Sequence, residues 1–126
     1  MKSKSKYLNK KTEVDGIWFD SQSEAHYYLL LVDKKAKGEI LDFERQPKFV
    51  LEEGFKKNNK KWSAITYKAD FKVIHLDGSI EVIDIKGGKL TTDFKLKRKL
   101  FEKRYMDLTL RLLKKQRNGF VEHEQS

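Results

Sequence analysis

The feature that most constrains the fold is a pair of apolar stretches, residues 62–75 and 80–86, separated by an Asp-Gly turn. An Asp-Gly pair between alternating apolar residues is typical of a tight β-hairpin. Side chains alternate between the two faces of a strand, so Asp84 and Lys86 should share a face, and strand pairing can bring Asp70 beside them. Two carboxylates can hold Mg²⁺ while an ammonium group sits beside the attacking water and a phosphate. The hairpin therefore predicts a metal-dependent phosphodiesterase site.

The Asp-x-Lys string is weak support by itself, because 37% of the residues are charged and the string recurs at Asp33, Asp70 and Asp93. Only the string at Asp84 lies in an apolar strand, follows a strand with another acid and precedes a Gly-Gly break. Burying a carboxylate and an ammonium group is unfavourable by several kcal/mol unless a metal or phosphate compensates. The alternative is a cross-strand ion pair, which contributes well under about 1 kcal/mol when exposed.

Composition limits the size and the partners of the protein. A chain of 126 residues with 38% hydrophobic residues can build one compact domain. Its net charge of +9 favours a polyanionic partner, nucleic acid first and an anionic membrane second. No apolar run is long enough to span a membrane, so we expect a soluble cytoplasmic protein. With no Cys and three scattered His, any metal should be bound by oxygen atoms, as Mg²⁺ is, with Mn²⁺ able to substitute.

Turn and capping signals predict one α+β domain at residues 12–115, between a basic flexible arm (1–11) and a polar tail (116–126). This domain should hold a mixed central sheet flanked by helices, with an N-terminal β-hairpin in front. The expected elements are a hairpin at 12–19, a helix from the capping box at 21–24 to near Gly38, and extended segments at 40–45 and 48–51. A loop at 54–61 follows, with Asn58-Asn59 as a hairpin tip. After it come the two acid-bearing strands, a helix from Thr92 to about Tyr105 and a strand at 108–113.

Five short segments match a known group of nucleases: Ser23-Glu24-Ala25, Arg45-Gln46-Pro47, Tyr67-Lys68-Ala69-Asp70-Phe71, Asp84-Ile85-Lys86-Gly87 and Phe94-Lys95-Leu96-Lys97. On these segments, in an αβββαβ order, the chain resembles the PD-(D/E)XK nuclease superfamily and, more narrowly, a family of small phage-encoded resolvase-like endonucleases. The resemblance extends over about residues 17–112 and departs at Ala69, where the superfamily pattern has proline. It implies a restriction-endonuclease-like core and a Mg²⁺-dependent DNA endonuclease.

The resemblance also implies roles for individual residues. Asp70, Asp84 and the Ile85 carbonyl would bind Mg²⁺. Lys86 would position the nucleophile or stabilise developing negative charge. Glu24 would assist the metal through a water, or else it serves only the helix backbone as the last residue of the capping box.

Other polar residues are candidates for substrate contacts. Gln46 either orients a water or a phosphate or satisfies backbone groups beside Pro47. Lys97 lies among the apolar residues of the second helix, with Leu96 and Phe101, so it either reaches the substrate phosphate or Glu24, or covers apolar surface with its stem. The lysines expected to contact DNA are Lys4, Lys6, Lys10, Lys11, Lys89 and Lys95.

A chain of this size has no room for a separate sequence-reading domain, so recognition of DNA structure fits better than recognition of a long target site. The resemblance points to branched or double-stranded DNA, and symmetric cleavage of a junction would require a homodimer. An alternative from another class is a nucleic-acid-binding module in which Asp70, Asp84 and Lys86 form only a structural network. A third is a basic inhibitor or adaptor of another protein.

Overall fold

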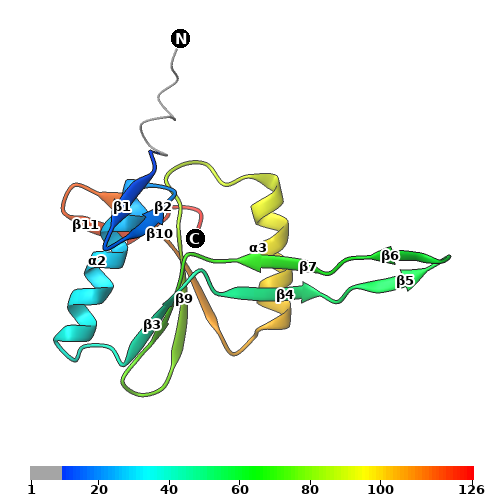
Figure 1. The fold of residues 1–126 in the computed structure, drawn as a ribbon, viewed down its shortest axis with the longest axis horizontal. Helices are drawn as coiled ribbons and strands as arrows, with labels where there is room; N and C mark the ends of the chain where they lie inside the picture. The colour runs from blue at the N-terminus through cyan, green and yellow to red at the C-terminus, as the bar shows by residue number, and fades with distance from the viewer. Residues whose placement is uncertain (1–9) are drawn as a thin grey trace, which may run out of the picture.

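A five-stranded mixed sheet forms the centre of the computed structural model, which describes residues 10–126 (Figure 1). Strand β10 runs parallel to β9, and the other neighbours are antiparallel. The predicted α+β class, with a mixed sheet and two helices, is confirmed. In sheet order the strands are β11 (Gly119–Glu122), β10 (Thr109–Gln116), β9 (Ile80–Ile85), β8 (Phe71–Ile74) and β3 (Asp42–Arg45).

The helices begin where the capping residues place them. Helix α2 (Gln22–Ala36) starts after Ser21, whose hydroxyl accepts a hydrogen bond from the backbone N–H of Glu24 (3.1 Å). Helix α3 (Thr92–Arg104) is capped in the same way by Thr91, one residue before the predicted cap. A side-chain oxygen at the N-cap satisfies a backbone donor that the first helical turn leaves unpaired.

The two helices cover opposite faces of the sheet (Figure 1). On one face α2 buries Tyr27 and Leu31 against Phe71 and Ile83, and the hairpin of β1 (Thr12–Val14) and β2 (Ile17–Phe19) closes that core. On the other face Phe94 and Phe101 of α3 are buried in one core with Val82 of β9 and Leu112 of β10. Alternation along β9 therefore sends Val82 and Asp84 toward α3, and Ile83 and Ile85 toward α2.

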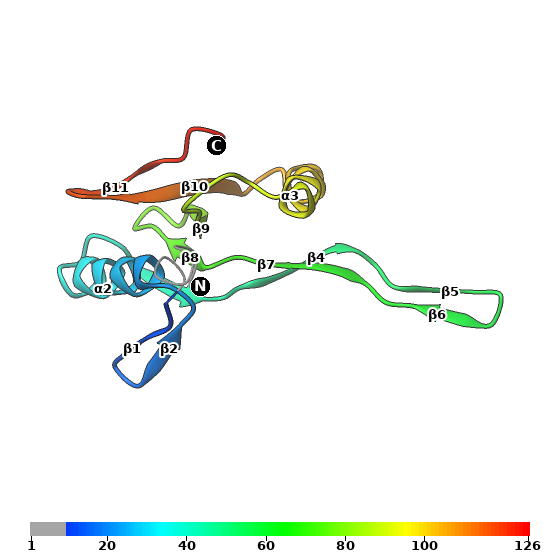
Figure 2. The same ribbon diagram turned by 90° about the horizontal axis from the view of Figure 1, so that it is seen from above.

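A long two-stranded ribbon leaves the body beside α3 and projects far from the sheet (Figures 1 and 2). Its inner part pairs β4 (Lys48–Glu52) with β7 (Ile65–Lys68), and its outer part pairs β5 (Phe55–Lys57) with β6 (Lys60–Trp62). We call residues 55–62 the β-arm. The predicted hairpin tip at Asn58-Asn59 is confirmed, but the surrounding residues 55–57 and 60–61 form strands and not a loop.

The predicted single strand at residues 62–75 is also wrong, because the chain changes partners at Ala69 and Asp70. Ala69 N–H donates to the Pro47 carbonyl (3.1 Å), whereas Asp70 N–H donates to the Ile83 carbonyl (3.2 Å). Strand β7 therefore belongs to the ribbon, and β8 belongs to the central sheet. The change of partners places Asp70 at the junction of the two.

The predicted polar tail is ordered as part of the sheet. Gln116 ends β10, and the next residues turn back to form β11. Phe120 packs edge-on against Tyr27, with ring centroids 4.9 Å apart, and His123 is buried with Nε2 2.7 Å from the Gly88 carbonyl oxygen. Residues 116–126 can be mostly polar because an edge strand buries only a few of its side chains, here Phe120 and His123.

Residues 1–9 lie outside the described part of the chain, and with them most of the predicted basic arm, including Lys4 and Lys6. Lys10 and Lys11 are described and exposed. Within residues 10–126, neither helix has the length and apolar character required to cross a membrane.

Candidate functional site

Asp70 and Asp84 meet where the chain passes from the ribbon strand β7 into β8, beside β9. Asp84 is 4% exposed on β9, and Asp70 is half-buried at the strand junction. The Ile85 N–H donates to Asp70 Oδ2 (2.7 Å), so Asp70 fills the place that a backbone partner would take in a continued strand. Burial, followed by the negative charge and hydrogen bonding of Asp84 and the charge of Glu24, raises the pKa of Asp70 far above its usual range. Two carboxylates in this position need a positive charge nearby if both are to ionise.

The backbone of Ile85 adds a third oxygen at the same place. In an antiparallel pair the N–H and C=O of one residue point toward the same neighbouring strand. Because the Ile85 N–H reaches Asp70, the Ile85 carbonyl also points to that side, while the Lys86 N–H turns to β10 and donates to Leu113 (2.8 Å). The carbonyl predicted as a metal ligand thus lies on the Asp70 side of β9.

Tyr67 is a site residue that the sequence reasoning missed. Its hydroxyl donates a short hydrogen bond to Asp84 Oδ2 from β7. Burial, then the charge of Asp84 and this hydrogen bond, raise the pKa of Tyr67, so the phenol stays a donor at neutral pH. The sequence does show that Tyr67 lies on the strand before Asp70. It does not show the change of strand partners at Ala69 and Asp70, which directs the Tyr67 hydroxyl toward Asp84.

Lys86 shares the Asp84 face, as the alternation rule predicted. Its Nζ lies 3.6 Å from Asp84 Oδ2 and 4.1 Å from the centre of the Phe94 ring on α3. The aromatic face and the carboxylate hold the ammonium group on one side of the acid pair. Lys86 itself is half-buried, so the charge remains accessible from the open end of β9.

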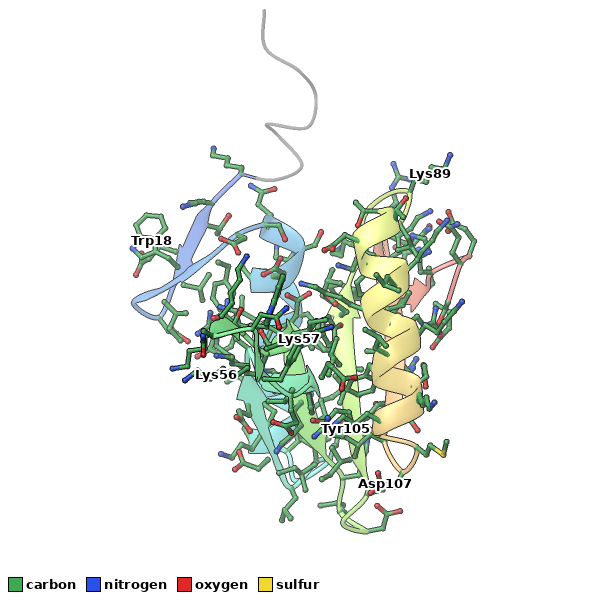
Figure 3. All side chains as sticks on the ribbon, turned by 90° about the vertical axis from the view of Figure 1, so that its right-hand side faces the viewer. Trp18, Lys56, Lys57, Lys89, Tyr105 and Asp107 are labelled. Carbon is green, nitrogen blue, oxygen red and sulfur yellow. The ribbon has the colours of Figure 1, made fainter. Side chains whose placement is uncertain are left out.

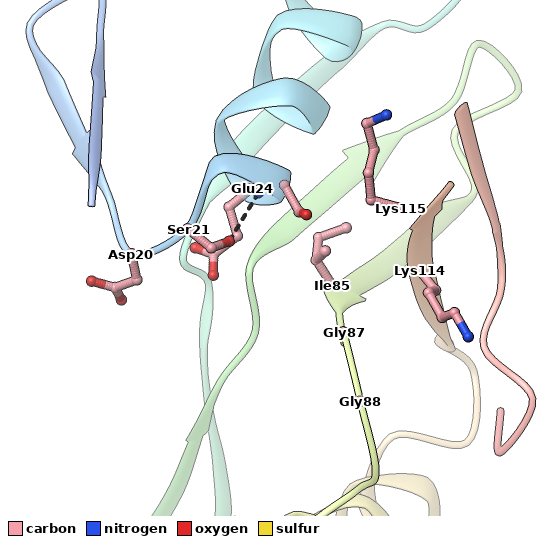
Figure 4. Close-up of a pocket in the computed structure, with 9 residues that line it drawn as sticks. Asp20, Ser21, Glu24, Ile85, Gly87, Gly88, Lys114 and Lys115 are labelled. Atoms are coloured by element: carbon pink, nitrogen blue, oxygen red, sulfur yellow. Dashed lines mark hydrogen bonds between the residues drawn. The ribbon is translucent and has the colours of Figure 1, made fainter. Parts of the chain in front are cut away.

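Glu24 approaches the acid pair from α2 and lines a pocket of about 610 Å³ with Ile85, Gly87 and Gly88 (Figure 4). Burial, then the negative charge of Asp20, raise the pKa of Glu24, and Asp84 adds to this increase. Its backbone N–H donates to the Ser21 hydroxyl, so Ser21 caps the helix, and Glu24 itself lines the pocket. The role of the Glu24 carboxylate at a metal stays a prediction.

The pocket also holds two lysines that the sequence reasoning missed, Lys114 and Lys115 of β10 (Figure 4). Lys114 Nζ lies 3.1 Å from Glu124 Oε1, and Lys115 Nζ donates to the Gln116 carbonyl (2.7 Å). They reach the site because β10 runs parallel to β9 and ends at the same edge. A strand–helix–strand order with a right-handed crossover was the signal that would have placed them.

Gln46 and Lys97 take up different positions. Gln46 has left-handed backbone geometry (φ 50°), its N–H donates to the Asp70 carbonyl (2.9 Å), and its side chain is exposed beside the site. Lys97 is half-buried on α3 and pairs with Asp93 (3.8 Å) rather than with Glu24. Leu96, expected on the buried face of this helix, is 59% exposed, because two residues of helix turn it to the side opposite Phe94.

The DNA contacts predicted near the site, Lys89 and Lys95, are exposed. Arg45 is another positively charged residue near this region. Its guanidinium carbon lies 4.7 Å from the centre of the Phe19 ring, and its buried Nε has no hydrogen-bond partner among the described residues. Arg45 entered the sequence analysis only within the matching segment Arg45-Gln46-Pro47. Its contact with Phe19 could not be predicted, because it depends on how β2 and β3 lie together in the fold.

The donors at this edge suit a hard divalent cation. Within residues 10–126, no three His, Cys, Asp or Glu side chains form a ready-made metal group. The side-chain ligands would therefore be Asp70 and Asp84, with the Ile85 carbonyl as the third oxygen and Glu24 acting through a water. An all-oxygen set with space for waters is the environment that Mg²⁺ prefers.

Comparison with known proteins adds a family. No curated protein and no solved structure matches the chain. A protein-family model described as "Protein of unknown function (DUF1064)" matches residues 4–118, which include both helices, the ribbon and the acid pair. The chain therefore belongs to the DUF1064 family.

Proposed function

We propose that the protein is a Mg²⁺-dependent endonuclease that hydrolyses phosphodiester bonds of DNA. The observation that carries the proposal is the acid pair of Asp70 and Asp84, close together beneath the open end of β9 with the Lys86 ammonium group 3.6 Å from Asp84. Two ionised carboxylates so close together repel each other, and a divalent cation bound between them removes this repulsion. The basic character of the chain supplies attraction for the substrate.

Each residue then has a defined task. Asp70, Asp84 and the Ile85 carbonyl would hold Mg²⁺, which Mn²⁺ can replace. Held by these residues, a divalent cation would supply a water of lowered pKa and positive charge beside the phosphate. Tyr67 fixes the Asp84 carboxylate by its hydrogen bond. Lys86 holds the attacking water or the phosphate oxygen, and Glu24 accepts a hydrogen bond from water in the pocket.

The resemblance to PD-(D/E)XK nucleases supports this proposal through the order of elements as well as through residues. With the ribbon strands β4 to β7 set aside, the order is α2, β3, β8, β9, α3, β10, which is an αβββαβ order with Asp84 on β9 and Asp70 just before β8. The departure at Ala69 has a local reason, because its N–H donates to the Pro47 carbonyl, and proline has no N–H to donate. Loss of the proline therefore leaves the position of Asp70 intact.

The substrate and setting follow from the same resemblance. We propose branched or junction DNA as the substrate, a 5′-phosphate as one product, and recombination or processing of phage DNA in the cytoplasm of the host as the setting. Symmetric cleavage of a junction would use a homodimer. Lys114 and Lys115 line the pocket, and we propose that they contact a phosphate adjacent to the one that is cut.

The experiment is cleavage of labelled linear, flap and four-way-junction DNA with Mg²⁺ or with EDTA, by the native chain and by Asp84→Asn. We expect the variant to lose cleavage while its DNA binding stays within about twofold, because a metal ligand is lost and the basic surface is not. Asp107→Asn, an exposed acid away from the site, is the matched control and should cut normally. Cleavage by Asp84→Asn, or by the native chain in EDTA, would contradict the proposal.

One observation favours the alternative of a non-catalytic nucleic-acid-binding module. Asp84 accepts a hydrogen bond from Tyr67, and Asp70 accepts one from Ile85, so both acids already serve the fold. If this network is their whole role, Asp84→Asn should lower the melting temperature and DNA binding together. The same variant therefore separates the two functions.

A further inference from the structure

The β-arm is a defined two-stranded ribbon and not a loose loop. Its tip residues Asn58 and Asn59 both have left-handed backbone angles (φ 52° and 60°), the geometry of the hairpin turn that matches strand twist. At its base, Gly54 lies so close to the opposite strand that a Cβ atom would come within 2.9 Å of the Trp62 carbonyl oxygen. The arm therefore holds a fixed register at both ends.

The arm carries four lysines, in two pairs that face one another across the strands. Lys56 lies opposite Lys61, and Lys57 lies opposite Lys60. Like charges directly opposite destabilise a hairpin. Among residues 10–126, none of the four forms an ion pair, and Glu53, the nearer of two acids at the base of the arm, is bound to Arg104 (2.6 Å). The arrangement is unfavourable in isolation and favourable beside a polyanion.

The lysines point to both sides of the ribbon. Strand alternation sends Lys56 and Lys61 to one face and Lys57 and Lys60 to the other. Figure 3 looks along the arm toward the body, with Lys56 and Lys57 at the projecting end. A two-stranded ribbon fits the major groove of duplex DNA, where phosphates line both walls. Charges on both faces match that geometry.

The aromatic pair of the arm favours a duplex over an unpaired strand. Phe55 and Trp62 are exposed, but their rings stack on each other with an interplanar angle of 11°, and Lys60 Nζ lies 4.5 Å from the Trp62 ring centre. Binding of unpaired bases requires free aromatic faces. Here those faces are partly covered, which leaves ring edges to contact sugars and groove walls.

We propose that the β-arm binds duplex DNA through its four lysines, as a clamp that holds the helix flanking the point of cleavage. Because a strand advances about 3.3 Å per residue, the tip lies up to roughly 40 Å along the chain from Asp70, comparable to one turn of duplex DNA. The choice of DNA as the ligand rests on the proposed function. Binding does not depend on hydrolysis, because the arm would hold DNA even if Asp70 and Asp84 took no part in cutting it.

The test measures affinity for a labelled duplex in EDTA over a range of KCl concentrations. The arm variant changes Lys56, Lys57, Lys60 and Lys61 to Gln, and a control with the same net charge changes the exposed Lys35, Lys37, Lys99 and Lys103 to Gln. Each phosphate contact contributes about 0.9 to the slope of log affinity against log salt, so the arm variant should lose about 3 to 4 from the slope. Equal slopes for the two variants, or no duplex binding by the native chain, would overturn the proposal.

A second measurement locates the contact. The chain has 2 Trp, so Trp18→Phe leaves Trp62 as the only indole. We expect duplex DNA to quench or shift Trp62 emission, and unchanged emission at saturating DNA would overturn the proposal. Cleavage is scored separately with Mg²⁺: a native chain that binds through the arm without cutting refutes the proposed nuclease and leaves the arm assignment standing.

Discussion

The Asp70→Asn variant tests the electrostatics of the acid pair through stability alone. In the metal-free protein the raised pKa of Asp70 means that the native state keeps a proton that the unfolded chain has lost above about pH 5. Stability falls with pH wherever the native state binds more protons than the unfolded state. Asparagine preserves the acceptor for the Ile85 N–H and cannot ionise, so it should remove this pH dependence.

The size of the effect follows from the proton linkage. Each pH unit in this range weakens the native state by up to about 1.36 kcal/mol, so pH 5 to pH 7 amounts to at most about 2.7 kcal/mol. For a domain of this length that is a relative change in melting temperature on the order of 5–10 °C. Relative to the native chain, Asp70→Asn should therefore gain stability steadily as pH increases.

The assay is thermal unfolding in EDTA at pH 5, 6, 7 and 8, followed by circular dichroism, with Asp107→Asn as the matched control. Parallel curves for the native chain and Asp70→Asn would refute the reasoning, since Asp70 would then ionise normally. Adding Mg²⁺ gives an internal comparison: it should flatten the pH dependence of the native chain, because the cation favours ionised carboxylates, and should have little effect on the variant.

Two lysine variants give further expected outcomes. Lys86→Met keeps an apolar stem against the Phe94 ring and should lower turnover about 100-fold or more while metal affinity, measured by calorimetry, changes little; a reversed pattern would contradict its role. Lys97→Met removes a weak pair with Asp93, so the melting temperature should stay within about 2 °C while cleavage falls. Lys99→Met on the outer side of the same helix is its control, and full activity of Lys97→Met would show that this lysine only covers apolar surface.

Local signals predicted much of the fold because they act over a few residues. The capping box at Ser21 and the turn at Asp15-Gly16 produced the expected helix and hairpin. The same held for the shared face of Asp84 and Lys86, which requires only strand alternation. These features depend on neighbours in sequence, so the sequence is enough to place them.

Long-range pairing accounts for what the sequence did not reveal. Nothing in the stretch around Ala69 indicates that the strand before it pairs with β4 while the strand after it pairs with β3 and β9. The β-arm has no β-branched residues and four lysines, so only its paired aromatic residues, Phe55 and Trp62, favour a strand in the sequence. Tyr67 reaches the site through the pairing of β7 with β4, and Lys115 through the parallel pairing of β10 with β9, which is why both were missed.

The construction of the ribbon also bears on how members of this family can diverge. Strands β5 and β6 pair only with each other among the described residues, and they lie beyond both cores. Inserting or deleting one residue in each strand changes the reach by about 3.3 Å and exchanges the two faces, whereas two in each strand restores them. Evolution can thus lengthen or shorten the arm in steps without disturbing Asp70 or Asp84, so reach and chemistry are free to vary separately.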